Sequence, residues 1–167
     1  MFSTIQHTQH PSKRFLIVDC PDDDTIALKY LPRLQSEGVT DIVRICDQSY
    51  YDSSPLRDAG IYVHDDLKFA DGEPPPEEVV EKWLALTNRV FENHGVVAVH
   101  CVSGIGRAPV LVAISLIDEG MDPYDAIEFI RKHRRGALNR KQVDYLLNRK
   151  RKRKRKSGLF LKMFKGK

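Results

Sequence analysis

The chain has 167 residues, of which 41% are hydrophobic, and this length suits one small domain with a short tail. Its longest largely apolar stretch, Val110 to Ile117, is far shorter than the about 20 residues of a membrane-spanning helix, and the first residues lack the pattern of a secretory signal. The formal net charge of +4 is unevenly distributed, because residues 149–167 hold 11 of the 27 basic residues and no acidic one, which leaves residues 1–148 with a net charge of −7.

This division predicts a folded domain over residues 1–148 and a polybasic, apolar-ended tail over residues 149–167. The three cysteines, Cys20, Cys46 and Cys101, lie far apart and form no CxxC pair. Their spacing suggests neither a metal site nor a disulfide framework, and it favours a reducing, cytoplasmic compartment.

The first half of the domain predicts strands that alternate with one helix. Phe15–Val18 and Asp41–Ile45 are short runs rich in β-branched or aromatic residues, and each predicts a strand. The segment between them predicts a helix that begins near Asp22 and ends at Gly38, with a kink or a late start caused by Pro32. Ile61–Val63 predicts a third strand.

The second half predicts a loop, one further strand and four helices. Residues 70–76 have the composition of a loop, and Pro76 can begin a helix that ends near Gly95. Val96–Val99 is continuously apolar, as a central strand covered on both faces should be. The remaining helices are predicted to begin near Pro109, at the cap Asp122 and at the cap Asn139. This order indicates an α/β fold with a mostly parallel central sheet flanked by helices in a single small domain.

The segment from His100 to Arg107 has the form H-C-x5-R between a predicted strand and a predicted helix. Five residues allow the backbone to curve around a dianion, and the helix adds its positive N-terminal end. A cysteine in this field favours the thiolate, so we expect Cys101 to be a nucleophile that forms a phosphocysteine. The guanidinium fork of Arg107 would bind the phosphate together with the loop residues Val102, Ser103, Gly104, Ile105 and Gly106. No cofactor or metal is expected. His100 is expected either to orient the loop or to be a hydrogen-bonded core histidine.

Several motifs resemble one phosphatase family. They are His100–Pro109 (HCVSGIGRAP), Gly38–Cys46 (GVTDIVRIC), Asp71–Pro75 (DGEPP) and Arg134–Asn139 (RRGALN). These segments resemble the phosphatases of regenerating liver, the PRL family of prenylated tyrosine phosphatases, and the resemblance covers about residues 13 to 156. It implies the protein-tyrosine-phosphatase fold and hydrolysis of phosphotyrosine in proteins, with phosphoserine and phosphothreonine as further candidates.

The resemblance also implies roles for individual residues. Asp71 matches the family's general acid, although an aspartate before glycine is also a common turn residue. Asp65 and Asp66 are the alternatives, because the sequence before Asp71 departs from the family. Cys46 matches a cysteine that forms a reversible disulfide with the nucleophile, whereas Cys20 has no counterpart and is expected to fill the core.

Ala108 stands where most related phosphatases have Ser or Thr. That hydroxyl stabilises the departing thiolate when the phosphocysteine breaks down, so the methyl group of Ala108 implies slow turnover, as is known of the family.

The alternative functions are a binding role and phosphoinositide hydrolysis. Family members bind cyclin-M magnesium transport mediators, and Arg134 and Arg135 are candidates for that surface, although basic residues that end a helix more often interact with its dipole. The absence of lysine from residues 102–106 argues weakly against a phosphoinositide substrate.

The tail begins with eight consecutive basic residues, Arg149 to Lys156. The chain as given ends Lys-Gly-Lys rather than with the family's CaaX cysteine, so prenylation is not expected. The tail is predicted first to bind an anionic membrane surface as a peripheral anchor, second to direct the protein to the nucleus, and third to be a solvated extension. Specific nucleic-acid recognition is not expected.

Overall fold

The computed structural model describes residues 1–46, 48 and 50–149 as an α/β fold. Its five strands form one sheet in the order β1-β2-β5-β3-β4. The pairing of β1 with β2 is antiparallel and the other three pairings are parallel. The strands are β1 (Phe2–Gln6), β2 (Arg14–Val18), β3 (Val39–Arg44), β4 (Tyr62–His64) and β5 (Val96–His100). The predicted class and the mostly parallel sheet are confirmed.

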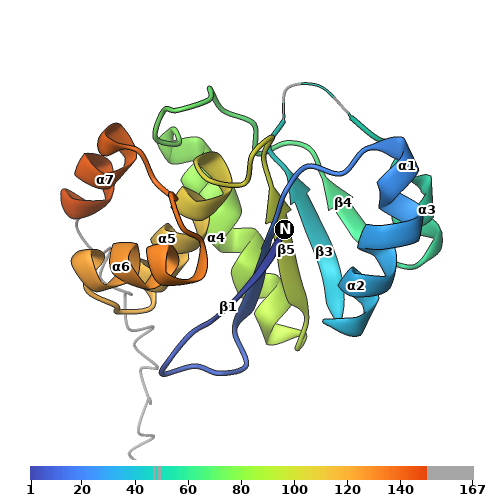
Figure 1. The fold of residues 1–167 in the computed structure, drawn as a ribbon. Helices are drawn as coiled ribbons and strands as arrows, with labels where there is room; N and C mark the ends of the chain where they lie inside the picture. The colour runs from blue at the N-terminus through green and yellow to red at the C-terminus, as the bar shows by residue number, and fades with distance from the viewer. Residues whose placement is uncertain (47, 49, 150–167) are drawn as a thin grey trace, which may run out of the picture.

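Helices cover both faces of the sheet (Figure 1). One side carries α1 (Asp23–Thr25), a π-helical turn η1 (Ile26–Tyr30), α2 (Leu31–Ser36) and α3 (Ser54–Asp58). The other side carries α4 (Glu77–Glu92), α5 (Arg107–Asp118), α6 (Pro123–His133) and α7 (Arg140–Leu147). No helix in the described ranges is both long and apolar enough to cross a bilayer.

The central strands serve two hydrophobic cores because successive side chains point to opposite faces. On β5, Val97 and Val99 belong to the core under α4, α5 and α6, whereas Val96 and Ala98 belong to the core under α2 and α3. Helix α5 is the most deeply buried helix, with eleven of its twelve residues buried. This burial fixes the position of the loop that joins β5 to α5.

Two elements of secondary structure were not predicted from the sequence. The sequence reading missed β1, because Ser3 occupies a buried position of the strand and breaks the alternation of apolar and polar residues. The hydroxyl of Ser3 is buried as a hydrogen-bond donor to the carbonyl of His133. The reading also missed the short helix α3. Pro32 has the predicted effect, since the regular helix α2 starts only at Leu31, after the π-helical turn.

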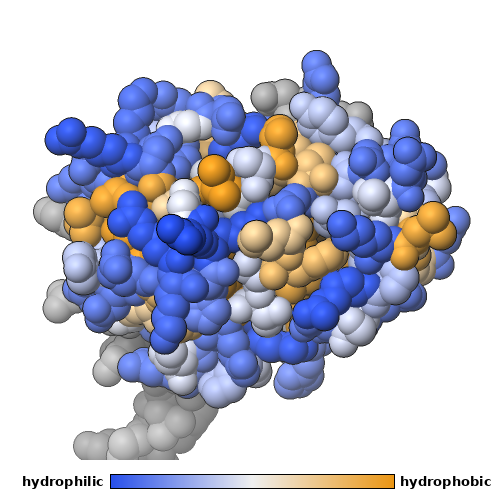
Figure 2. All heavy atoms as spheres, in the orientation of Figure 1, coloured by the Kyte–Doolittle hydropathy of each residue, from blue (hydrophilic) through white to orange (hydrophobic). Residues whose placement is uncertain are grey.

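Figure 2 shows the face that is turned toward the viewer in Figure 1. This face is mainly hydrophilic, and its hydrophobic areas are small and separate. A large continuous apolar area would mark a docking surface, and this face shows none among the described residues.

Candidate active site

The H-C-x5-R segment occupies the predicted place at the carboxyl end of the central strand. Strand β5 ends at His100, and α5 begins at Arg107, so the loop runs from Cys101 to Gly106. Cys101 is only 1% exposed. The N-terminal end of α5, with its partial positive charge, faces the same loop.

The backbone of this loop is fixed from outside. Four successive carbonyl oxygens accept hydrogen bonds from other segments: Val102 O from Cys20 N (3.2 Å), Ser103 O and Gly104 O from Arg134 Nη2 (3.2 Å) and Nε (2.9 Å), and Ile105 O from Leu138 N (2.8 Å). A trans peptide unit is planar, so each carbonyl and the following N–H group point in opposite directions. The amides of residues 103–106 therefore point away from these partners, to the opposite side of the loop.

Gly104 is essential to this shape. Its φ of +67° lies in the left-handed region, and a Cβ added there would lie 2.2 Å from Arg134 Nη2 and 2.8 Å from the carbonyl oxygen of Val18. Only glycine allows such close approach together with that backbone conformation.

Arg134 has a different position from the one suggested by the sequence. It is 2% exposed, pairs with the carboxylate of Asp19 and contacts the hydroxyl of Ser3 at 3.5 Å. A guanidinium group carries five donors in a fixed fork, and Arg134 uses this fork to hold two carbonyls of the loop. The prediction that it lies at a partner surface is therefore wrong. Arg135 is exposed.

Arg107 is also buried, at 2% exposure. Its Nη1 donates to the carbonyl oxygens of Ile45 and Phe69, each at 3.2 Å, and its Nε lies 3.2 Å from Asp71 Oδ1. These contacts join the end of β3, the loop over residues 65–76 and the first turn of α5 at one point.

Among the three candidate acids, only Asp71 contacts Arg107. Its side chain is 77% exposed, and its Oδ1 also accepts a hydrogen bond from Gly72 N at 3.1 Å, as an aspartate in a turn before glycine does. Asp65 instead forms a two-point ion pair with Arg44 at 2.6 and 2.7 Å, which lowers the pKa of Asp65 and keeps it ionised. Asp66 is exposed and has a distant ion pair with Lys82 at 3.9 Å.

The loop that carries Asp71 is held against the start of α7. Asn139 Nδ2 donates to the carbonyl of Gly72 at 2.8 Å, and the Lys141 ammonium pairs with Glu73 at 2.6 Å. Gln142 Nε2 also donates to the carbonyl of Glu73 at 3.3 Å. These contacts hold the loop in the position at which Asp71 meets Arg107.

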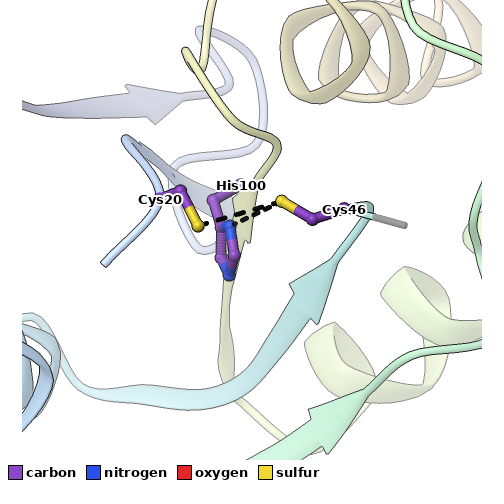
Figure 3. Close-up of side chains that lie close together, drawn as sticks. All are labelled: Cys20, Cys46 and His100. Carbon is purple, nitrogen blue, oxygen red and sulfur yellow. Dashed lines mark hydrogen bonds between the residues drawn. The ribbon is translucent and has the colours of Figure 1, made fainter. Parts of the chain in front are cut away.

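Cys46, Cys20 and His100 form a cluster beside the active-site loop (Figure 3). Cys46 Sγ lies 3.9 Å from Cys20 Sγ and 3.7 Å from His100 Nδ1. Both cysteines of the cluster, like Cys101, are free thiols. The hydrogen bond between the two sulfurs, assisted by His100, lowers the pKa of the Cys46 thiol, and the same bond raises the pKa of Cys20. Cys20 is partly exposed and faces Cys46, so the prediction that it fills the core is wrong.

Cysteine spacing gave no sign of this cluster, but strand order could have revealed it. Cys20 follows β2 by two residues, Cys46 follows β3 by two residues, and His100 ends β5. These are three adjacent parallel strands, whose carboxyl ends meet at one edge of the sheet. Folding thus brings together three possible donor side chains that the spacing of the cysteines along the chain did not suggest.

The remaining predicted residues lie in the loop or directly beside it. His100 is buried, and both of its ring nitrogens have polar neighbours: Nε2 lies 2.9 Å from the Tyr51 hydroxyl and Nδ1 lies 3.4 Å from the carbonyl oxygen of Cys101. It is therefore a hydrogen-bonded core histidine that also contacts the loop. Ala108 is fully buried in the first turn of α5. Val102 and Ile105 expose 47% and 44% of their surface.

Comparison with known proteins assigns the fold and the family. Residues 20–121 match the family model described as "Polymorphic toxin system, DSP-PTPase phosphatase". The chain is 45% identical over 154 residues to a probable protein tyrosine phosphatase type IVA A of Dictyostelium discoideum, with 91% of this chain and 89% of the relative covered. It is 51% identical over 135 residues to the human protein tyrosine phosphatase type IVA 3, with 80% and 76% covered. The chain belongs to the PRL family of protein tyrosine phosphatases.

A solved structure agrees with this assignment. A putative protein tyrosine phosphatase from Leishmania major, 35% identical, superimposes with a TM-score of 0.78 over 90% of this chain and 99% of the other. This PRL phosphatase therefore has the protein-tyrosine-phosphatase fold and is a cysteine-dependent phosphatase, as the sequence predicted.

Proposed function

We propose that Cys101 is the nucleophile of this phosphatase and that residues 102–107 bind the phosphate group. The observation that carries the proposal is the set of four loop carbonyls bonded outward, because it turns the amides of residues 103–106 toward the opposite, phosphate-binding side. The positive end of α5 supports a dianion at the same place.

In the first step, the Cys101 thiolate attacks phosphorus and the bond to the tyrosine oxygen breaks. The sulfur–phosphorus bond forms as the phenolate leaves, and Asp71 gives that oxygen a proton. Arg107 binds two phosphate oxygens with its planar fork. Its contacts with Ile45, Phe69 and Asp71 are then replaced by contacts with the substrate.

In the second step, water attacks the phosphocysteine. Asp71, now a carboxylate, takes a proton from the water, the sulfur–phosphorus bond breaks, and inorganic phosphate leaves with Cys101 restored as a thiolate. At Ala108 a buried methyl group takes the place of a hydroxyl that would stabilise this thiolate, so this step is slow.

The test is turnover of an aryl phosphate by the wild type and three variants. Cys101→Ser should abolish turnover, Asp71→Ala should lower kcat by about 10²–10⁴-fold as loss of a general acid does, and Ala108→Ser should raise kcat. Asp66→Ala is the matched control, since Asp66 is an exposed acid of the same loop that does not contact Arg107. An equal loss in Asp66→Ala and Asp71→Ala, or turnover by Cys101→Ser, would overturn these assignments.

We further propose that the enzyme acts on phosphoproteins and that oxidation regulates it. Peroxide would oxidise Cys46 and Cys101 to a disulfide, with reduction of the peroxide to water and loss of both thiol protons. The lowered pKa of Cys46 supports this, because the thiolate is the reacting form. Mass spectrometry after peroxide treatment should find a peptide that joins Cys46 to Cys101, and its absence would refute the pairing.

We propose binding to a cyclin-M-type magnesium transport mediator from the family resemblance. We propose binding to an anionic membrane surface from the charge of residues 149–167. Residues 150–167 lie outside the described residues. The expected location is the cytoplasm, with attachment to a membrane surface through the tail, and the nucleus is the alternative. Sedimentation with anionic vesicles should require the tail, so equal binding by a chain that ends at Asn148 would exclude a membrane role for it.

A further inference from the structure

The cluster of Cys20, Cys46 and His100 lies beside the active-site loop, and the phosphatase mechanism does not use Cys20 (Figure 3). We propose that these three side chains form a binding site for one thiophilic divalent ion of the zinc type, bound by two cysteine sulfurs and one histidine nitrogen. The proposal concerns ion binding and does not depend on the catalytic roles assigned above.

Two of the three distances between the donors are close to those that a tetrahedral zinc ion requires. Zinc binds thiolate sulfur at about 2.3 Å and histidine nitrogen at about 2.0–2.1 Å, so tetrahedral geometry separates two sulfurs by about 3.8 Å and a sulfur from a nitrogen by about 3.5 Å. The structure has 3.9 Å between Cys20 Sγ and Cys46 Sγ and 3.7 Å between Cys46 Sγ and His100 Nδ1. All three donor atoms lie within 4.8 Å of one another. Shifts of a few tenths of an ångström would bring these two edges to the tetrahedral values, and the third edge, from Cys20 Sγ to the His100 ring nitrogen, would have to close from within 4.8 Å to about 3.5 Å.

The donors come from rigid places. Cys46 and His100 are 3% and 1% exposed, and both lie at or just beyond the ends of adjacent central strands. The backbone N–H of Cys20 donates to the carbonyl of Val102 at 3.2 Å, which ties the third donor to the active-site loop. A site on such elements needs little reorganisation to bind an ion.

His100 is oriented as a metal ligand usually is. Its Nε2 lies 2.9 Å from the Tyr51 hydroxyl. Metal-bound histidines commonly use the other ring N–H as a donor to an oxygen atom, which fixes the tautomer. With the proton on Nε2 and donated to Tyr51, the lone pair of Nδ1 is directed at the ion.

A fourth ligand can enter from solvent. The cluster forms part of the wall of a cavity of about 230 Å³, which is lined also by Arg44, Gln48, Tyr50, Tyr51, Asp65 and Lys68. This is ample room for a water molecule, which occupies the fourth position in zinc sites with three protein ligands. Two thiolates neutralise a divalent ion, and the nearby Arg44 is already paired with Asp65, so the bound ion leaves no unbalanced charge.

The donor set selects the type of ion. Two sulfurs and one imidazole favour zinc and similar soft ions over magnesium or calcium, which prefer oxygen ligands. Occupancy would have two consequences for the enzyme. It would hold Cys46 away from a disulfide with Cys101, and it would exclude the tautomer in which Nδ1–H of His100 donates to the Cys101 carbonyl, a contact of 3.4 Å in the structure. We therefore expect bound zinc to inhibit turnover.

The test is titration of the full, reduced, metal-stripped chain with cobalt(II), under a phosphine reductant that carries no thiol. We expect one ion per chain, a sulfur-to-cobalt charge-transfer band, and displacement of cobalt by zinc. Cys20→Ser and Cys46→Ser should each lose the band. Tyr51→Phe, which removes only the outer partner of His100, should weaken binding by about 10–100-fold. Thermal unfolding of each variant would show that it is folded.

Cys101→Ser is the matched control, because it removes the one other thiol but none of the three ligands. It should bind cobalt as the wild type does. Zinc should inhibit the turnover of Cys20→Ser less than that of the wild type. Binding that survives in Cys20→Ser, or that is lost in Cys101→Ser, would move the ion to the active-site loop and overturn the proposal. Absence of a sulfur charge-transfer band in the wild type would also overturn it.

Discussion

Gly104→Ala tests how tightly the active-site loop is packed against Arg134. Forcing an alanine into the left-handed region costs about 1–2 kcal/mol. The added Cβ would lie 2.2 Å from Arg134 Nη2 and 2.8 Å from a carbonyl oxygen of β2, and relief of such overpacking costs about 1–3 kcal/mol more. The free energy of unfolding should fall by about 2–5 kcal/mol, which for a chain of this length lowers the Tm by about 4–20 °C.

Two other glycines separate the contributions to this loss. Gly60 also has a positive φ, of +79°, but a Cβ added there meets no described atom within 4 Å, so Gly60→Ala measures backbone strain alone. Gly106 has a negative φ, of −116°, and an added Cβ would make only an ordinary contact of 3.5 Å with Gln142, so Gly106→Ala should cost less stability than Gly104→Ala. The assay is thermal and urea unfolding of the three variants. Equal losses in Gly104→Ala and Gly60→Ala would refute the argument that Arg134 packs directly against the loop.

Two further predictions concern stability elsewhere in the domain. Arg44 lowers the pKa of Asp65 in the folded state, so the pair stabilises the protein above the unfolded pKa and ceases to do so as the pH falls through the folded pKa. Asp65→Asn should therefore cost about 1 kcal/mol near neutral pH, a value discounted for the 41% exposure of Asp65. The difference in urea unfolding should shrink as the pH falls below the ordinary pKa of an aspartate. A constant difference at every pH would contradict this account. Trp83 Nε1 donates to the buried hydroxyl of Ser115 at 2.8 Å, so Trp83→Phe should lower the free energy of unfolding by about 1–3 kcal/mol in the same assay, and an unchanged midpoint would show that the bond contributes nothing.

The sequence predicted those features of the site that depend on neighbours along the chain. The spacing from Cys101 to Arg107 fixes a loop between a strand and a helix, and apolar Val96–Val99 identifies the central strand. The structure then distinguished Asp71 from Asp65, because only contacts with Arg107 and Arg44 separate two acids that look alike in the sequence.

Features built from distant segments escaped prediction for a physical reason. Arg134 lies 30 residues from Gly104, and a basic residue at the end of a helix gives no sign that it turns inward. Ser3 hides a strand because its hydroxyl finds a buried partner, which hydropathy does not register. Cys20 and Cys46 are brought together only by the order of strands in the sheet.

The contacts that fix the active-site loop involve its main chain and Gly104, so they leave other side chains of the loop free to change. Its curvature is held by main-chain oxygens and by Gly104, whereas Val102 and Ile105 turn nearly half of their surface to solvent. Replacing these two side chains changes the rim that meets the rest of a substrate without touching a single bond that shapes the loop. Preference for one phosphorylated target over another can therefore drift while the chemistry of the centre is conserved.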